Sequence, residues 1–179
     1  MNSTLYLTRN GLLEPLGQSQ VMAYLRGLSH QHTITLITYE KPQDWADATA
    51  MNRARADCNA HGIQWLPQRF RSHPKIIAPL FSMIRMVWLV RREVIRGDIR
   101  LIHARSYIPA AVALIVSRIT RVPFIFDMRA LWPEELIIAG RLRRRSLIHL
   151  AIVAAERACL AKSSAVISLT HAAATYLKS

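Results

Sequence analysis

The sequence predicts an α/β domain with a doubly wound, mostly parallel sheet and helices on both faces. Short runs of β-branched and apolar residues alternate with longer runs of helical spacing along the whole chain. The connections between the short runs are too long for tight hairpins, and parallel strands need crossovers of this kind. The length of 179 residues fits one domain, and 51% hydrophobic residues can build its core.

Six short apolar runs predict the strands, and the one at 33–39 shows the alternation of β-branched and apolar residues that is typical of a strand. Asp44 is expected to cap the second helix, while Gly62 and Gly97 follow the ends of the second and third helices. The predicted strands are 4–8, 33–39, 63–66, 101–104, 123–127 and 165–169. The predicted helices are 19–30, 44–61, 75–96, one opened by Pro109, 146–162 and a last short one capped by Thr170.

The chain carries a strong excess of positive charge. Its 24 basic and 11 acidic residues give a formal net charge of +13. This excess favours a negatively charged partner. Charge alone does not distinguish between an anionic membrane, a nucleotide, a phosphorylated lipid and nucleic acid. Nucleic acid is disfavoured, because no RNP-like aromatic motif, zinc finger or helix-turn-helix is recognisable. Most of the basic side chains are expected to be solvated surface.

Cysteine usage and hydropathy favour a cytoplasmic protein. Cys58 and Cys159 are far apart and have no metal-ligand spacing around them, so we expect reduced thiols and no metal site. No signal peptide is recognisable at the N-terminus. The longest apolar stretch, 76–90, contains Pro79 and Arg85 and is shorter than the ~20 residues of a membrane span. Within the cytoplasm, the protein could also be located at the inner face of the membrane.

Ligands of open parallel sheets bind outside the carboxyl ends of the strands. The first such loop, 11–20, leads into the first helix, and its Gly17 can bring backbone amides close to an anion such as pyrophosphate. The alternative is that Gly17 only makes a turn. No G-x-G-x-x-G or G-x-x-x-x-G-K-[ST] motif is present, so the dehydrogenase and P-loop functions lose their main support.

Polar side chains also follow the fourth and fifth predicted strands. His103 ends the fourth strand, with Arg105 and Ser106 beyond it. Asp127 ends the fifth strand and could act on a proton or a sugar hydroxyl, while Arg129 offers a planar fork for phosphate or carboxylate.

The same loop continues with Trp132, Glu134 and Glu135. The alternative for the whole loop is structural. Asp127 and Arg129 would then pair with each other, and the two glutamates would only favour a helix N-terminus.

Residues 101–110 (LIHARSYIPA), 126–134 (FDMRALWPE) and 155–169 (AERACLAKSSAVISL) follow one another downstream of 17–20 (GQSQ). In this order and spacing they resemble the N-terminal domains of GT-B-fold, family-4-type glycosyltransferases. The sequence departs from the family pattern in two regions. Many members place a histidine at the end of the fifth strand, where this sequence has Arg129, with Asp127 two residues earlier, and the usual glycine after that arginine is Ala130. Ser164 and Ala165 stand where an aspartate is usual.

The resemblance implies a retaining, metal-independent transfer of a sugar from a nucleotide sugar to a glycan or lipid-linked acceptor, as in polysaccharide biosynthesis. It implies that 1–179 is one Rossmann-like domain, the acceptor-binding N-terminal half of a hexosyltransferase-type enzyme. The donor-binding C-terminal half, which carries two glutamates eight positions apart in the family, is absent from this sequence. We therefore expect this half to be inactive alone, and we expect no cofactor besides the donor nucleotide sugar.

Carried onto this sequence, the resemblance defines an expected site without a metal. The expected catalytic residues are His103, Asp127 and Arg129. The expected substrate-binding residues are Gly17, Gln18, Arg105, Ser106, Trp132 and Glu134.

The main alternative function is a non-catalytic basic α/β module that binds an anionic membrane or nucleic acid. The helix expected over 76–95 is too short and too charged to span a membrane but could lie in the headgroup layer. Its expected apolar face is Ile77, Leu80, Phe81, Ile84, Trp88 and Val94, with basic residues Arg85, Arg91, Arg92 and Arg96. A second basic group lies at 141–145. The alternative is that this helix only covers the sheet, with its arginines stabilising its own C-terminus.

Overall fold

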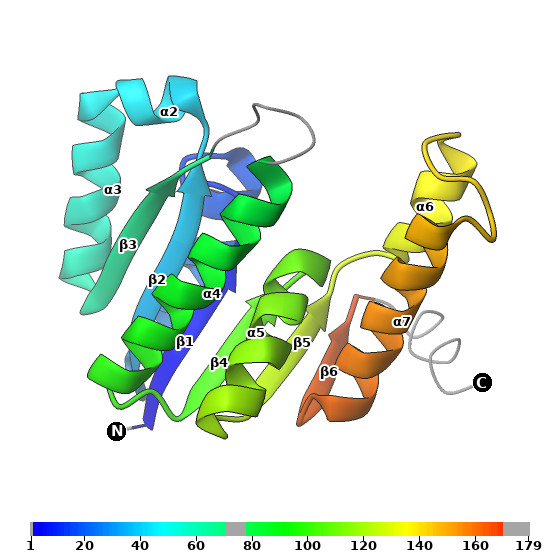
Figure 1. Ribbon diagram of the computed structural model, residues 1–179. Helices are drawn as coiled ribbons and strands as arrows, with labels where there is room; N and C mark the ends of the chain where they lie inside the picture. The colour runs from blue at the N-terminus through cyan, green and yellow to red at the C-terminus, as the bar shows by residue number, and fades with distance from the viewer. Residues whose placement is uncertain (1, 71–77, 170–179) are drawn as a thin grey trace.

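The computed structural model describes residues 2–70 and 78–169. The strands form one six-stranded parallel sheet in the order β3-β2-β1-β4-β5-β6, which confirms the predicted fold class (Figure 1). This order is that of doubly wound Rossmann folds. The strands are β1 (Asn2–Thr8), β2 (His32–Glu40), β3 (Ile63–Arg69), β4 (Leu101–Arg105), β5 (Phe124–Met128) and β6 (Ala165–Ser168).

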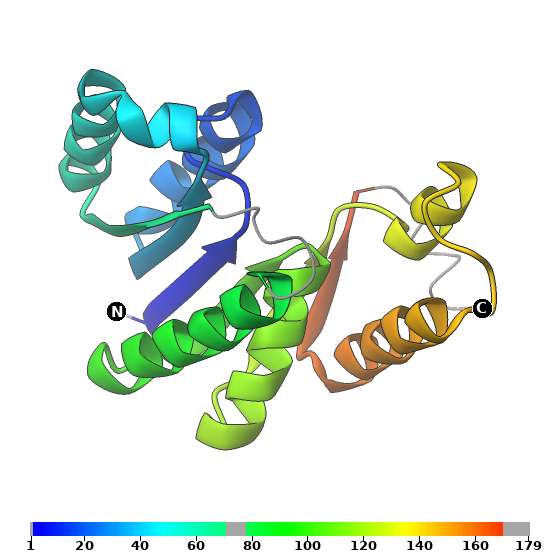
Figure 2. The ribbon, with the colours of Figure 1, turned by 45° about the horizontal axis from the view of Figure 1, so that its top comes forward.

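Helices lie on both faces of the sheet. Helices α4, α5 and α7 lie on one face, and η1, α1 and α3 lie on the other (Figure 2). Helices α2 and α6 lie beyond the carboxyl ends of the strands (Figure 1). The bounds are η1 (Gly17–Met22), α1 (Ala23–Ser29), α2 (Pro42–Ala46), α3 (Ala48–Ala60), α4 (Ala78–Arg96), α5 (Tyr107–Thr120), α6 (Trp132–Ile138) and α7 (Leu147–Lys162).

Two apolar clusters, one on each face, form the core. Successive side chains of a strand point to opposite faces, so Leu5 and Leu7 of β1 pack toward α4 and α5 while Tyr6 packs toward α1 and α3. All three are almost completely buried. Leu36 and His103, which are in register with Tyr6 on the neighbouring strands, therefore point to the same face of the sheet as Tyr6, the face that α1 covers.

The structure corrects the predicted start of the second helix. Proline begins helices well because its fixed backbone angle suits the first turn, and here Pro42 starts the separate short helix α2. Asp44 therefore lies in the first turn of α2, and Asp47 caps α3 by accepting a hydrogen bond from the backbone N–H of Ala50 at 2.9 Å. The first helix also begins earlier than predicted, as a π-helical turn at Gly17. The predicted cap Thr170 and the predicted helix start at 75–77 lie outside the described residues.

Candidate functional site

The candidate site lies where the strand order reverses. Strands β1 and β4 are neighbours, with Tyr6 opposite His103, although two strands separate them in sequence. The chain winds from β1 toward β3 on one side and from β4 toward β6 on the other. Ligands of doubly wound sheets bind at this reversal, at the carboxyl ends of the strands.

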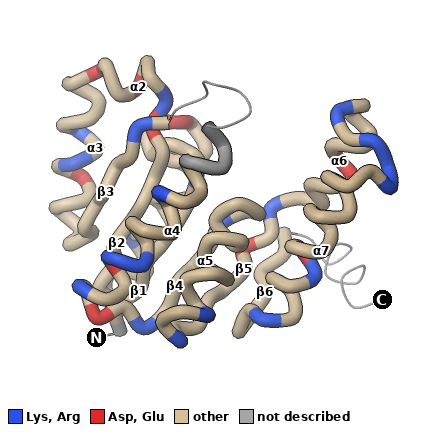
Figure 3. Tube along the Cα trace, in the orientation of Figure 1, with Lys and Arg blue, Asp and Glu red and all other residues tan. Residues whose placement is uncertain are grey.

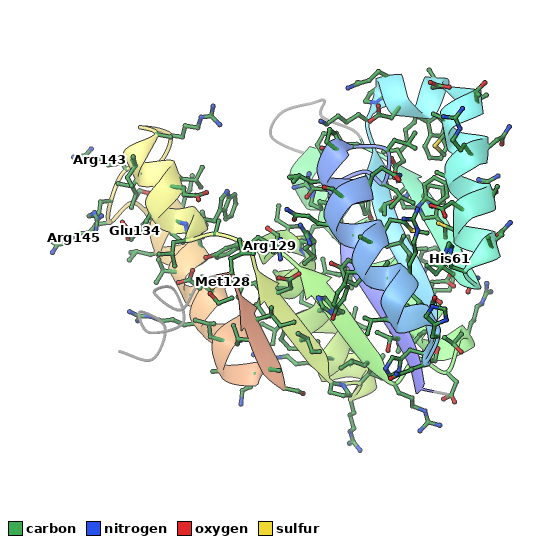
Figure 4. All side chains as sticks on the ribbon, turned by 180° about the vertical axis from the view of Figure 1, so that it is seen from behind. His61, Met128, Arg129, Glu134, Arg143 and Arg145 are labelled. Carbon is green, nitrogen blue, oxygen red and sulfur yellow. The ribbon has the colours of Figure 1, made fainter. Side chains whose placement is uncertain are left out.

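Asp127 is the centre of a buried polar cluster at this place. Its Oδ2 lies 3.4 Å from Nε2 of His103 and 3.9 Å from Nη1 of Arg105, and its Oδ1 lies 3.4 Å from Nη1 of Arg129. Asp127 is 4% exposed, and Arg105 stands beside it in the β4–β5 register. Figure 4 shows Arg129 at the end of β5, next to Met128. The structure thus brings together all three residues predicted to be catalytic, and it also contains the pairing of Asp127 with Arg129 that the structural alternative expected.

The surroundings of Asp127 keep its carboxyl ionised. Burial alone would raise its pKa, but the hydrogen bond with His103 and the charges of Arg129 and Arg105 outweigh burial, so the pKa lies below its ordinary value. An ionised carboxylate can accept hydrogen bonds and stabilise positive charge, whereas it has no proton to donate.

Gln20 joins the two arginines of this cluster, and the sequence analysis did not select it. Its Oε1 accepts a hydrogen bond from Nη2 of Arg105 at 2.5 Å and another from Nη2 of Arg129 at 2.7 Å. Gln20 lies in η1, three residues after Gly17. The sequence signal was its position at the start of the helix that follows the first loop, where a side chain can face the strand ends.

Aromatic rings enclose the histidine. The ring of His103 lies 4.5 Å from that of Tyr6 and 5.8 Å from that of Tyr24, between centroids. The side chain of His103 is only 6% exposed. Burial raises the pKa of the Tyr6 phenol, and a hydrogen bond with Arg105 opposes part of that rise. His103 therefore supports Asp127 from within the fold.

A buried carboxylate holds the first loop in place. Glu40, at the end of β2, is fully buried and accepts hydrogen bonds from the backbone N–H groups of Leu12 (2.8 Å) and Leu13 (3.3 Å) and from the Thr38 hydroxyl (2.5 Å). The sequence analysis did not select Glu40, because its partners lie 27 and 28 residues away in the chain.

The two predicted residues of this loop, Gly17 and Gln18, serve the loop's own shape. A side chain at Gly17 would collide with the backbone carbonyl oxygens of Gly11 and Leu12. The side-chain amide of Gln18 donates to the Leu12 carbonyl oxygen at 2.8 Å. The close turn that they make carries the chain into η1, and so it positions Gln20.

Ser106 connects β4 to α5 through an unusual backbone conformation. Its φ of 76° is rare for a residue other than glycine. The backbone N–H of Ser106 donates to the carbonyl oxygen of Asp127 at 2.8 Å. Such strained residues gather at functional sites, where the surrounding structure holds them. The predicted substrate-binding residue Ser106 therefore lies beside the backbone of the central carboxylate.

Trp132 and Glu134 have their partners elsewhere. The ring of Trp132 packs 5.5 Å from that of Tyr107 in the core on the α5 face, and Glu134 forms an exposed ion pair with Arg144 at 2.7 Å. The Tyr107 hydroxyl binds Oε2 of Glu156 at 2.6 Å, which joins α5 to α7. Both predicted residues thus help to hold α6 and its neighbours.

The described residues contain neither a cluster of metal ligands nor a membrane-spanning helix. Within 2–70 and 78–169, no three His, Cys, Asp or Glu side chains gather so that they could hold a metal ion. Within the same ranges, no helix is long and apolar enough to cross a membrane. One surface hollow, of about 840 Å³, lies at the amino ends of β1, β2 and β4, and another, of about 480 Å³, lies between α3 and the first loop with η1 and α1.

The fold is a Rossmann-like α/β domain, and the polar cluster lies at its strand-order reversal. The profile of the glycosyl transferase 4-like domain family matches residues 17–179. The chain therefore belongs to this family, as the sequence resemblance predicted. A search of curated proteins found no match.

Solved structures share the fold at low sequence identity. Anabaena Alr3699/HepE, in complex with UDP and glucose, is 16% identical, and the match covers 99% of this chain and 41% of that chain at a TM-score of 0.57. Arabidopsis thaliana UGT89C1, in complex with UDP, is 12% identical, with 98% and 47% covered and a TM-score of 0.57.

A Listeria monocytogenes protein described as a UDP-N-acetylglucosamine 2-epimerase is 8% identical, also at a TM-score of 0.57, with 99% and 41% covered. The chain thus spans less than half the length of these neighbours. Since one of them is described as an epimerase, the fold alone does not decide the reaction, and the family match carries the assignment to glycosyltransferases.

Proposed function

We propose that this chain is the acceptor-binding, N-terminal half of a retaining glycosyltransferase. The proposed enzyme transfers a sugar from a nucleotide sugar to a glycan or lipid-linked acceptor, as in polysaccharide biosynthesis in the cytoplasm. The observation that carries the proposal is the ionised Asp127, held among His103, Arg105 and Arg129 at the strand-order reversal, in a chain of the glycosyl transferase 4-like family.

The residues of the cluster take different roles in this proposal. Asp127 accepts a hydrogen bond from the acceptor hydroxyl or stabilises the reacting sugar. Arg129, whose side chain is 24% exposed, is the cation that a phosphate can reach. His103, whose ring is enclosed by those of Tyr6 and Tyr24, acts as a positioning residue for Asp127.

The second half of the enzyme supplies the donor site in this proposal. The neighbouring structures are more than twice as long as the part that this chain matches. Transfer needs both substrates held in reactive geometry, which one wall of a cleft does not provide. We therefore expect the 179-residue chain to fold but to turn over no nucleotide sugar. Turnover by this chain alone would contradict the division into halves.

The test of the site uses the complete enzyme that contains this domain. Asp127→Asn removes the negative charge and keeps the shape, so turnover should fall by ~10²–10⁴, the usual contribution of an acid–base group. The control is Asp98→Asn, whose side chain is 82% exposed and pairs with Arg100. Asp98→Asn should melt near the wild-type temperature, whereas Asp127→Asn should melt lower, because it loses the ion pairs with Arg105 and Arg129. Full activity with a much lower melting temperature would show that Asp127 is structural.

An anionic membrane surface is the proposed partner of the outer face of α4. Ile84, Trp88 and Ile95 are each about 60% exposed on this helix, and the guanidinium of Arg92 lies 5.1 Å from the centre of the Trp88 ring. The sequence analysis placed Val94 on this face, which is wrong, because Val94 is buried in the core. Of the other predicted apolar residues, Ile77 lies outside the described residues and the side chains of Leu80 and Phe81 are not described.

A second surface of the same character surrounds the α6–α7 connection. Figure 3 shows the basic residues gathered there, and Figure 4 shows Arg143 and Arg145 at the end of the molecule, with Glu134 nearby. Ile138 and Leu147 beside them are each 85% exposed. Apolar side chains among arginines suit a layer of acidic headgroups.

Co-sedimentation with vesicles tests the membrane contact. Binding should require anionic lipid, fall with salt, and weaken when Arg91, Arg92 and Arg96 become Gln, because each loses about 1 kcal/mol of attraction to the leaflet. The double variant of Arg91 and Arg92 has a matched control in the double variant of Arg53 and Arg55 on α3, which lies on the opposite face of the sheet. Equal binding to neutral vesicles would show that α4 only covers the sheet.

A further inference from the structure

Two arginines converge on a single neutral oxygen in the polar cluster. Each guanidinium directs one nitrogen, Nη1, toward Asp127 and the other, Nη2, to Oε1 of Gln20. Asp127 thus orients Arg105 and Arg129 so that their remaining donors meet at one point. The oxygen at that point carries only the partial charge of a carboxamide.

The charges of the cluster are not balanced. Arg105 has a side chain that is only 9% exposed, so its positive charge is largely removed from water. Asp127 is the one carboxylate within ion-pair distance of the two arginines among the described residues. A buried charge is costly unless it is paired and hydrogen-bonded. A full negative charge in place of the Gln20 oxygen would complete the pairing.

Gln20 is exposed, whereas the guanidinium of Arg105 beneath it is buried. Its side chain has no other hydrogen bond recorded among the described residues. Gln20 can therefore rotate into solvent at the cost of two hydrogen bonds to a neutral oxygen, which an anion replaces with stronger, charge-assisted bonds. Arginine donors suit the tetrahedral oxygens of a phosphoryl group.

We infer that Arg105 and Arg129 form a binding site for a phosphoryl group of the substrate, and that the Gln20 side chain occupies this site until the substrate displaces it. The inference rests on the proposed function, whose donor and lipid-linked acceptor both contain phosphoryl groups. Gln20 is then a specificity residue, because an uncharged ligand cannot displace it.

Isothermal titration of the 179-residue chain with inorganic pyrophosphate at constant ionic strength tests this site. Arg129→Met and Arg105→Met should each weaken binding about tenfold or more, the value of a lost charge-assisted bond. Gln20→Ala should bind pyrophosphate at least as tightly as the wild type. The control Arg55→Gln removes an equal charge from the exposed surface of α3 and should change little.

Gln20→Glu is the decisive variant, because it keeps both arginines. Its carboxylate should pair with them, raise the melting temperature without ligand, and abolish most of the pyrophosphate binding. If Gln20→Glu binds pyrophosphate as the wild type does, or if Arg55→Gln loses as much affinity as Arg129→Met, the site is not where we infer it.

Competition identifies the source of the phosphoryl group. Displacement of pyrophosphate by UDP assigns the site to the donor, and displacement by a short isoprenyl diphosphate assigns it to a lipid-linked acceptor. Competition by neither compound overturns the inference. Loss of the pyrophosphate site, in a complete enzyme that still needs Asp127 for turnover, would overturn this inference and leave the proposed function intact.

Discussion

The two edges of the sheet are built differently. At one edge, β3 buries Ile63 and Trp65 beneath α3, and the Trp65 indole N–H donates to the Thr38 hydroxyl at 2.8 Å. At the other edge, β6 leaves Val166 39% and Ile167 37% exposed. Both strands carry apolar side chains, but within the described residues only those of β3 lie beneath a helix that buries them.

The helices next to these two edges also differ in how many side chains they bury. Helix α3 buries Met51, Ala54 and Cys58, which follow the spacing of one helical face. Helix α7 is longer but buries Cys159 alone, and its Leu147 is 85% exposed. Large exposed apolar patches often mark contacts with other molecules or other parts of a protein. The β3 edge is thus complete in itself, whereas the β6 edge has the character of a contact surface.

A core substitution on the central strand should have the largest effect. Leu5→Ala removes a fully buried side chain of β1, and the free energy of unfolding should fall by about 3 kcal/mol. Ile167→Ala at the β6 edge should lower it by less than about 1 kcal/mol, because much of that side chain is already in water. Urea denaturation followed by circular dichroism measures both. Similar losses would show that the β6 edge is packed as tightly as the centre.

Removing the carboxylate of Glu40 should have the next largest effect. Glu40→Ala leaves the N–H groups of Leu12 and Leu13 and the Thr38 hydroxyl without their acceptor. The free energy of unfolding should fall by about 2 kcal/mol, and hydrogen exchange of the Leu12 amide should accelerate. An unchanged exchange rate at Leu12 would mean that the loop keeps its shape without Glu40.

The stability contributed by Asp127 should depend on pH. Its pKa in the folded protein lies below the ordinary 3.8, so its contribution is complete above that value and is lost as the pH falls through the lower folded value. The melting temperature of the wild type should therefore drop more than that of Asp127→Asn between about pH 5 and about pH 2. Parallel curves for the two proteins would contradict a lowered pKa.

Polar substitutions on the exposed end of α7 should have the smallest effect. Leu147→Ser and Ile148→Ser replace side chains that are 85% and 67% exposed. Each should change the free energy of unfolding by no more than about 0.5 kcal/mol. A loss above about 2 kcal/mol would show that these side chains support the fold of this domain and are not a free contact surface.

Much of the fold was predictable from local patterns. The β-branched run at 33–39 and the apolar run at 123–127 predicted β2 and β5, because strands select these residue types wherever they lie. The second helix was predicted with the wrong cap, since Asp44 and Asp47 both fit the N-cap rule and only the turn at Pro42 decides between them.

The sequence by itself determined the alternation of strands and helices, the parallel sheet, and the presence of His103, Arg105, Asp127 and Arg129 at strand ends. These follow from periodicity and from the geometry of crossovers, which are local properties of the chain.

Only the tertiary structure decided the partners of these residues. Gln20 reaches Arg105 and Arg129 across 85 and 109 positions, and Glu40 reaches back to the first loop. It also decided that, among the described residues, β3 buries Ile63 and Trp65 while β6 leaves Val166 and Ile167 more than a third exposed, because burial depends on which helix packs over a strand.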